Sequence, residues 1–262
     1  MNTTLITAGL ARAISRSLPD CALLHLPRGE FDLVLARRQH ARYVGALEQA
    51  GVRMTVLPEL PDLPDATFVE DAAVVLDEVA IVCRLGAASR ESEAETIVPV
   101  VAPWHPVRRI ISPGTLEGGD VLRIGRMLFV GLSSRSNAEG IRQLEAIVSP
   151  FGYHVRPVAV RGCLHLKTAV TAPADGLLMA NPAWVDLTPF AGLEMVPVPA
   201  DEPWGANTLA VNGTVFVAGS APETARRLRG RGLSVLSLDV SELQKAEAGL
   251  TCLSVLFSAA RT

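Results

Sequence analysis

Short apolar runs occur in pairs along this chain, and each pair is joined by residues that favour tight turns. Apolar runs of this length with a turn between them predict β-hairpins. The turn of the last pair is Asn212-Gly213, a strong signal for a type I′ turn. Four hairpins are predicted: Ala72–Leu76 with Ala80–Cys83, Val121–Ile124 with Met127–Val130, Ala169–Ala172 with Leu177–Ala180, and Leu209–Val211 with Val215–Ala218.

A helical pattern follows two of these hairpins, and an extended run follows each helix. Ser136 and Glu139 have the spacing of a capping box, and Ser220 and Glu223 repeat it. Apolar residues at helical spacing come after the first box. The predicted elements are a helix from Ser136 to Val148 with a strand at Tyr153–Val160, and a helix from Ser220 to Arg229 with a strand at Ser234–Leu238.

The two ends of the chain are predicted to share a fifth unit. Its parts are a strand at Thr4–Ala8, a helix at Ala36–Ala50, a strand at Val52–Leu57 and a terminal strand at Thr251–Phe257. Closing a ring by pairing the first and last strands removes exposed sheet edges. The predicted fold class is therefore α/β, a five-bladed propeller of ββαβ units with pseudo-five-fold symmetry, and residues 1–262 are expected to form a single domain.

Composition narrows the ligand and the compartment. The chain has 262 residues, of which 19% are charged, and its net charge of -3 includes no long acidic or basic block, which argues against binding to nucleic acid or to an anionic membrane. No apolar run approaches ~20 residues, the length that a helix needs to cross a membrane, so no transmembrane helix is predicted. Residues 1–19 share the basic composition of a transit peptide, but a core strand is favoured there. Four widely separated cysteines fit neither a zinc pattern nor a disulfide framework, which favours reduced thiols and a cytoplasmic protein.

Polar residues with catalytic chemistry stand where the predicted hairpins and the terminal strand begin. In a ring of such units these positions lie at one end of the central channel, although turns recruit Asp and Asn for conformational reasons as well. Together they offer a carboxylate, an imidazole and a thiol, the parts of a cysteine-based hydrolytic site. The residues are Asp71, Glu117, Asp120, His165, Asn207 and Cys252.

Each of these groups also has a purely structural interpretation. A cysteine in an apolar strand, such as Cys252, is most often a small buried hydrophobic residue. His165 is open to two other readings, a core histidine or one half of a metal pair with Cys163. No further ligands at metal spacing accompany that pair, so no metal is predicted.

The remaining charged candidates suit an amino acid that carries a guanidinium group. Asp65, Glu70 and Asp71 cluster at one hairpin start, and carboxylates hold a guanidinium through forked hydrogen bonds. Arg90 and Arg135 each follow a serine at the end of a hairpin, from where they could bind a carboxylate. Taken singly, each arginine is more often a solvated surface residue.

These motifs together resemble the dimethylarginine dimethylaminohydrolase family, and the resemblance covers nearly the whole chain. That family belongs to the guanidino-group-modifying, or pentein, superfamily, which has a five-fold pseudosymmetric ββαβ propeller. The motifs, in chain order, are Asp65, Phe68-Val69-Glu70-Asp71, Ser89-Arg90, Glu117-Gly-Gly-Asp120, Ser134-Arg135-Ser-Asn137, His165-Leu-Lys-Thr168 and Thr251-Cys252-Leu-Ser254.

The resemblance implies a catalytic set of three residues. Cys252 would be the nucleophile, His165 the general acid and base, and Glu117 the carboxylate that orients and charges the site. The implied reaction is hydrolysis of asymmetric dimethylarginine or monomethylarginine to citrulline and dimethylamine or methylamine, through a covalent thiouronium on the cysteine sulfur. Neither a metal nor an organic cofactor is implied, and a homodimer is left open.

The resemblance also implies how such a substrate would be held. The guanidinium would lie between acidic side chains, and the α-carboxylate and α-amine would have separate partners, one of them in a mobile lid. The implied substrate-binding residues are Glu70 and Asp71 for the guanidinium, Arg90 and Arg135 for the α-carboxylate, and Asp65 with the backbone near Leu18, in the lid, for the α-amine.

Three alternatives remain at this point. Arginine deiminases use the same nucleophile and base on unmethylated arginine, but they carry a second guanidinium-binding carboxylate where this chain has Lys167, and they contain an additional helical domain. Agmatine deiminases would leave Arg90 and Arg135 without a carboxylate to bind. A non-catalytic binding protein with the same propeller is the alternative of another class, and it gives no reason for Cys252, His165 and Glu117 to converge.

Overall fold

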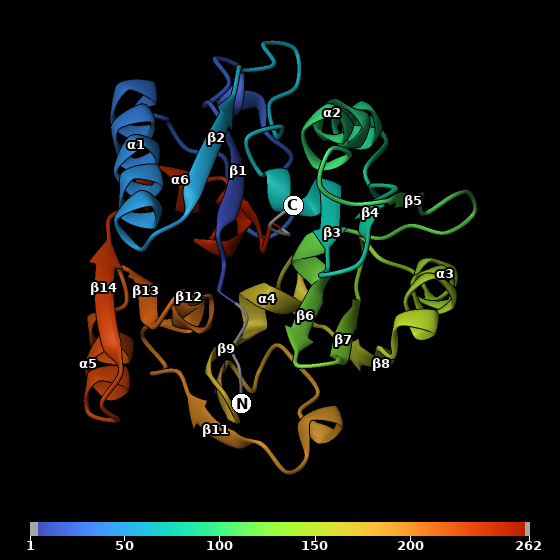
Figure 1. The fold of residues 1–262 in the computed structure, drawn as a ribbon. Helices are drawn as coiled ribbons and strands as arrows, with labels where there is room; N and C mark the ends of the chain where they lie inside the picture. The colour runs from blue at the N-terminus through green and yellow to red at the C-terminus, as the bar shows by residue number, and fades with distance from the viewer. Residues whose placement is uncertain (1–4, 260–262) are drawn as a thin grey trace.

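The computed structural model describes residues 5–259, which form five three-stranded sheets set in a ring (Figure 1). In each sheet the middle strand pairs antiparallel with an inner strand and parallel with an outer strand, in the orders β15-β1-β2, β3-β4-β5, β6-β7-β8, β9-β10-β11 and β12-β13-β14. The strands are β1 (Ala8–Arg12), β2 (Arg53–Leu57), β3 (Ala73–Val75), β4 (Ala80–Val82), β5 (Val107–Arg109), β6 (Val121–Ile124), β7 (Met127–Leu132), β8 (His154–Ala159), β9 (Val170–Ala174), β10 (Leu177–Ala180), β11 (Glu194–Pro197), β12 (Leu209–Val211), β13 (Thr214–Ala218), β14 (Ser234–Leu238) and β15 (Val255–Phe257).

Among the described residues, three longer helices lie at the periphery of the ring, and of three short helices one, α4 (Leu166–Ala169), lies near the middle of the ring (Figure 1). Within the part of the chain that the structure describes, none of the helices is long and apolar enough to cross a bilayer. The helices are α1 (Leu33–Gln49), α2 (Val98–Val101), α3 (Ala138–Val148), α4 (Leu166–Ala169), α5 (Pro222–Arg229) and α6 (Ser241–Gln244).

The four predicted hairpins are confirmed, and so is the sharing of one sheet by the two ends of the chain. β15 pairs antiparallel with β1, with Gly9 opposite Leu256. The turn between β12 and β13 has φ values of 48° at Asn212 and 87° at Gly213, and a type I′ turn needs positive φ at both positions. The predicted five-module α/β propeller is therefore the observed architecture.

The predicted strands at the two termini are placed wrongly. The N-terminal strand covers Ala8–Arg12 instead of Thr4–Ala8; residues 5–7 precede it, and residue 4 lies outside the described residues. This strand is buried along its whole length and therefore lacks an alternating pattern. At the other end, Thr251–Leu253 forms a 3₁₀ turn, and only Val255–Phe257 is extended.

Both predicted capping boxes are wrong in detail. Asn137 caps α3, because its Oδ1 accepts the N–H of Gly140 at 2.8 Å. At α5 the first N–H groups are bonded by the distant carboxylate of Glu202, which accepts from Glu223 and Thr224 at 2.7 Å each. The serines Ser136 and Ser220 are thus free for other contacts, and a carboxylate far away in the sequence does the work of a cap.

Two outer strands, β5 and β11, were not predicted. They are short, and β5 consists of a valine and two arginines while β11 ends in a proline. Strands at a sheet edge carry polar residues and proline more often than central ones, so their hydrophobic signal is weak.

The core on one side of the ring anchors the segment that carries Cys252. Tyr43 and Leu47 of α1 are fully buried and lie in one apolar cluster with Leu250 and Leu253. The Tyr43 hydroxyl also forms a hydrogen bond of 2.6 Å with Ser254 Oγ. Burial of these side chains fixes the backbone on both sides of the predicted nucleophile.

Candidate active site

A tight helical turn precedes each of the five inner strands, and each turn carries or adjoins one of the predicted catalytic or polar residues. This arrangement confirms that the residues lie at the same end of the ring, as the hairpin starts predicted. The turns are Val69–Ala72 before β3, Gly118–Asp120 before β6, Leu166–Ala169 before β9, Pro203–Ala206 before β12 and Thr251–Leu253 before β15.

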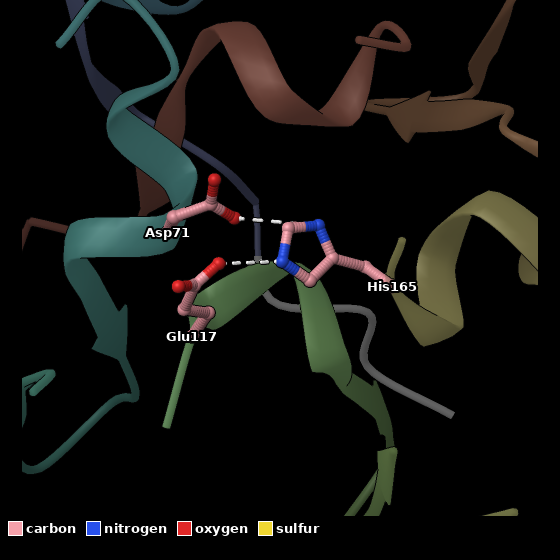
Figure 2. Close-up of side chains that lie close together, drawn as sticks. All are labelled: Asp71, Glu117 and His165. Atoms are coloured by element: carbon pink, nitrogen blue, oxygen red, sulfur yellow. Dashed lines mark hydrogen bonds and ion pairs between the residues drawn. The ribbon is translucent and has the colours of Figure 1, made fainter. Parts of the chain in front are cut away.

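Asp71, Glu117 and His165 converge from three modules (Figure 2). His165 Nε2 lies 2.6 Å from Glu117 Oε2, and His165 Nδ1 lies 3.8 Å from Asp71 Oδ1. All three side chains are buried. Gly119 lies against them: a Cβ there would come within 2.8 Å of Asp71 Oδ1 and of the imidazole, so the close approach requires glycine.

The charges of the His165–Glu117 pair follow from this geometry. Burial lowers the pKa of His165, but the charge of Asp71 and the hydrogen bond to Glu117 outweigh it and raise that pKa to about 9. Burial raises the pKa of Glu117, yet its hydrogen bond to His165 and the charge of that imidazolium lower it to about 2. At neutral pH the pair is therefore an imidazolium beside a carboxylate, and His165 can donate a proton.

Cys252 is a neutral thiol in this environment. It lies in the 3₁₀ turn before β15, and the N–H of Gly249 points to its Sγ at 3.4 Å. Burial, followed by the charges of Glu70 and Asp71, raises the pKa of Cys252 to about 12. A positive charge placed near the sulfur would reverse the effect of the carboxylates and favour the thiolate.

Glu70 connects the nucleophile turn to a neighbouring module. Its Oε1 lies 2.5 Å from Lys167 Nζ, and its Oε2 accepts the Thr251 hydroxyl at 2.7 Å. Asn207 completes the connection, because its side-chain amide donates to the Lys167 carbonyl and to Thr251 Oγ1 and accepts from the Thr251 N–H. In the sequence, Lys167 served only to distinguish this chain from the arginine deiminases, and its contact with Glu70 was not predicted.

The two arginines are buried, which excludes the interpretation of solvated surface side chains. Arg90 donates to Asp71 Oδ2 at 2.8 Å, to both carboxylate oxygens of Glu93, and to the carbonyls of Asp65 and Phe68. All three of its guanidinium nitrogens are thus engaged. Sequence reasoning missed Glu93, although its spacing of three residues from Arg90 on a helical segment is the available signal.

Arg135 also faces the His165 pair, with its Nη1 3.4 Å from Glu117 Oε1. Asp120 has a supporting part: it accepts the N–H of Leu166 at 2.9 Å and the hydroxyl of Ser133 at 2.6 Å. These bonds fix the turn that begins after His165, so the imidazole is oriented by its backbone as well as by Glu117.

The residues predicted to bind the α-amine, Asp65 and Leu18, lie in two segments that contact each other. The Asp65 carboxylate accepts the N–H of Ala22 at 3.1 Å, and its backbone carbonyl accepts from Arg90 at 3.3 Å. Leu18 is fully buried, and its carbonyl accepts the N–H of Cys21 at 3.0 Å. The segment from residue 18 to 22 is thereby held beside Asp65.

A cavity of about 620 Å³ lies against three of the inner strands. Inner strands β3, β6 and β15 line it, and both Glu70 and Lys167 reach it. Because Glu70 also contacts Thr251, the Glu70–Lys167 ion pair lies between this cavity and the nucleophile turn.

Within residues 5–259, one group of side chains has the spacing of metal ligands. Asp71, Glu117 and His165 each offer one oxygen or nitrogen atom, and these atoms lie within 4.8 Å of one another. Each carboxylate of this group also contacts an arginine. The Cys163 thiol instead contacts the backbone carbonyl of His165 at 3.4 Å, which is the structural role of a buried cysteine.

Comparisons with known proteins agree on one family. The family model described as N,N dimethylarginine dimethylhydrolase, eukaryotic, matches residues 30–171. A protein of Pseudomonas aeruginosa named N(G),N(G)-dimethylarginine dimethylaminohydrolase is 35% identical over 250 residues, which cover 95% of this chain and 98% of the relative. A protein of the same name from Streptomyces coelicolor is 39% identical over 248 residues, covering 94% of this chain and 95% of the relative.

A solved structure extends the likeness to three dimensions. The Pseudomonas aeruginosa enzyme, as a cysteine-to-serine mutant complexed with citrulline, superposes with a TM-score of 0.92 at 33% identity and covers 97% of this chain and 100% of that chain. Sequence and fold thus match over nearly the full length. The chain belongs to the dimethylarginine dimethylaminohydrolase family.

Proposed function

We propose that this protein hydrolyses N-omega-methylated arginines, asymmetric dimethylarginine and monomethylarginine, to citrulline and dimethylamine or methylamine. The observation that carries the proposal is the position of Asp71, whose charge acts on Cys252 and whose Oδ1 lies 3.8 Å from Nδ1 of His165 in the buried His165–Glu117 pair. The names and the bound citrulline of its relatives support the same substrate class.

The carboxylates prepare the site for a guanidinium. In this assignment Asp71 and Glu70 hold the substrate guanidinium, which is always protonated near neutral pH. The same two carboxylates raise the pKa of Cys252, so a guanidinium that neutralises them removes the electrostatic reason for the thiol to keep its proton. Substrate binding would therefore generate the thiolate next to the guanidinium carbon, and the thiol proton would leave to solvent because His165 is already protonated.

The chemical steps then use Cys252 and His165. The thiolate attacks the guanidinium carbon and forms a C–S bond, and the imidazolium of His165 gives its proton to the departing dimethylamine as the C–N bond breaks. A covalent thiouronium remains on the sulfur. Neutral His165 then takes a proton from water, and the water oxygen bonds to the same carbon. The hydroxyl so formed loses its remaining proton to solvent as the carbonyl forms, and the C–S bond breaks to release citrulline and the thiolate. Glu117 stabilises the imidazolium throughout.

The groups around Asp65 would bind the α-carboxylate and the α-amine of the substrate and so select substrates by their length. Arg90 and Arg135 are assigned to the α-carboxylate, and Asp65 with the Leu18 backbone, in a lid over the channel, to the α-amine. Arg90 is already bonded to Asp71, to Glu93 and to two backbone carbonyls, so a substrate carboxylate would share the Arg90 guanidinium with these partners.

Lys167 supports methylated over unmethylated arginine as the substrate. It occupies the position of the second guanidinium-binding carboxylate in arginine deiminases. One guanidinium nitrogen then has no carboxylate of its own and can carry methyl groups.

The test is citrulline formation by the purified protein without added metal or cofactor. Asymmetric dimethylarginine, monomethylarginine, arginine and agmatine would be compared at equal concentration, and the two methylated substrates are expected to react fastest. Preference for arginine would transfer the protein to the deiminases. A Cys252→Ser variant with full turnover would overturn the nucleophile assignment, and no citrulline from any substrate would favour the non-catalytic binding protein.

We further propose a cytoplasmic enzyme that needs neither a metal nor a cofactor and in which residues 1–262 form one catalytic domain. The four cysteines are free and buried, as is usual in a reducing compartment. The homodimer left open by the sequence can be tested by light scattering. The substrate groups assigned above all belong to one chain.

A further inference from the structure

One carboxylate outside the site described above organises a whole loop. Glu247 Oε1 accepts three successive backbone N–H groups, from Leu24 at 2.9 Å, His25 at 2.6 Å and Leu26 at 2.7 Å. Glu247 itself is buried. A carboxylate that collects three consecutive N–H groups holds that piece of chain, part of the 22–32 loop, in one curved conformation.

The backbone of Glu247 indicates that its side chain is the reason for its presence. Its φ is 59°, in the left-handed region that glycine or asparagine usually occupies at the end of a helix. Its N–H donates to the carbonyl of Gln244 at 3.0 Å, which closes the turn after α6. A glutamate at a position suited to glycine is explained by the contacts that its carboxylate makes.

Two other side chains of the same segment hold the far end of the 22–32 loop. Glu242 Oε2 accepts the N–H of Asp32 at 2.9 Å, and Lys245 Nζ donates to the carbonyl of Glu30 at 2.9 Å. Lys245 is in turn paired with Glu242 at 2.8 Å. The loop is therefore fixed to one short stretch of chain at its middle and at its end.

That stretch leads directly to the nucleophile, while the loop begins at the predicted α-amine site. The N–H of Ala22 is bonded to the Asp65 carboxylate, and the N–H of Gly249, just after Glu247, points to Cys252 Sγ. Displacement of the loop would thus shift Asp65 and the turn that carries the thiol.

We propose that Glu247 is a positioning residue, which holds the 22–32 loop so that Asp65 and Cys252 keep the spacing that one substrate molecule requires. It does not touch the reacting atoms. The proposal rests on the proposed function for the identity of the substrate, and the hold on the loop can be measured without substrate.

The first experiment replaces Glu247 by glycine. This change removes the acceptor and relieves the left-handed backbone, so the fold is not endangered. Two results are expected: amide hydrogen exchange at residues 24–26 becomes about tenfold faster, and KM for asymmetric dimethylarginine rises about tenfold while kcat falls less. Glu247→Gln retains an acceptor oxygen, so its exchange rate and its KM are both expected to lie between those of the wild type and those of Glu247→Gly.

The second experiment removes a donor from the loop side. Leu24→Pro deletes one of the three N–H groups, and Leu24→Ala is the matched control because the leucine side chain is 56% exposed and its N–H is retained. The proline variant is expected to raise KM and the exchange of the neighbouring amides in the same direction as Glu247→Gly. The alanine variant is expected to behave as the wild type.

Unchanged exchange and unchanged KM in Glu247→Gly would overturn the proposal. So would faster exchange with an unchanged KM, since the loop would then be held by Glu247 without serving the site. A wild-type protein that makes no citrulline would instead refute the proposed function, and the exchange comparison would still decide whether Glu247 holds the loop.

Discussion

Replacing Glu117 by glutamine is expected to lower the pKa of His165 and to move the activity of the enzyme to lower pH. The environment raises this pKa from an ordinary 6.5 to about 9. A shift of that size corresponds to about 3 kcal/mol in favour of the imidazolium. Asp71 and Glu117 together outweigh burial, so loss of the Glu117 charge and hydrogen bond should lower the pKa by about 1–2 units.

The same pair predicts how stability depends on pH. Because the pKa of His165 is raised, its contribution is complete below about pH 6.5 and is lost as the pH rises through about 9. Because the pKa of Glu117 is lowered, its contribution is present above pH 4.5 and is lost as the pH falls through about 2. The difference in unfolding free energy between the wild type and Glu117→Gln should therefore be largest between pH 4.5 and 6.5.

The assay is an NMR titration of protein labelled with ¹⁵N-histidine, together with kcat/KM for asymmetric dimethylarginine across the same pH range. Glu145→Gln, at an exposed position of α3, is the control and should leave the His165 titration unchanged. If His165 still titrates near pH 9 in Glu117→Gln, then Asp71 and the other carboxylates alone hold the imidazolium, and the reasoning about Glu117 is refuted.

Three further changes test other parts of the site. Because the pKa of Cys252 is raised to about 12, iodoacetamide should alkylate this thiol slowly at pH 7.5, and a guanidinium ligand too small to cover the sulfur should accelerate the reaction; equal rates would contradict the electrostatic account. Lys167→Met leaves the carboxylate of Glu70 buried without its cation, so urea unfolding should show a loss of about 3 kcal/mol at pH 8 and a smaller loss at pH 5, where that carboxylate can take a proton. Gly119→Ala should lower kcat/KM about 100-fold by displacing the imidazole, whereas Gly45→Ala, at a position with open space, should leave it unchanged.

Local chemistry explains what the sequence could predict about the fold. The Asn212-Gly213 turn and the alternating apolar runs specify hairpins through interactions between near neighbours, and the hairpin starts place Asp71, Glu117, His165 and Cys252 at one end of the ring. The outer strand β5 carried no such signal, because an edge strand buries little and tolerates arginine.

Pairings between modules could not be read in advance. Glu202 caps α5 from outside the helix, and Lys167 neutralises Glu70 across nearly a hundred residues of chain. Such contacts depend on which modules the ring makes adjacent, and a window of sequence contains no information about that. The contact between Arg90 and Glu93 is the exception, since it is local and was missed only because no helix was expected there.

Closure of the ring by β15 against β1 has a consequence for how the protein is made. Ribosomes deliver Asp71, Glu117 and His165 well before Cys252, and the nucleophile turn lies next to the strand that completes the last sheet. A nascent chain could fold its middle modules while still lacking the thiol. The reactive sulfur would therefore enter the site in the same event that closes the ring, so that incomplete chains carry a charged but inert pocket.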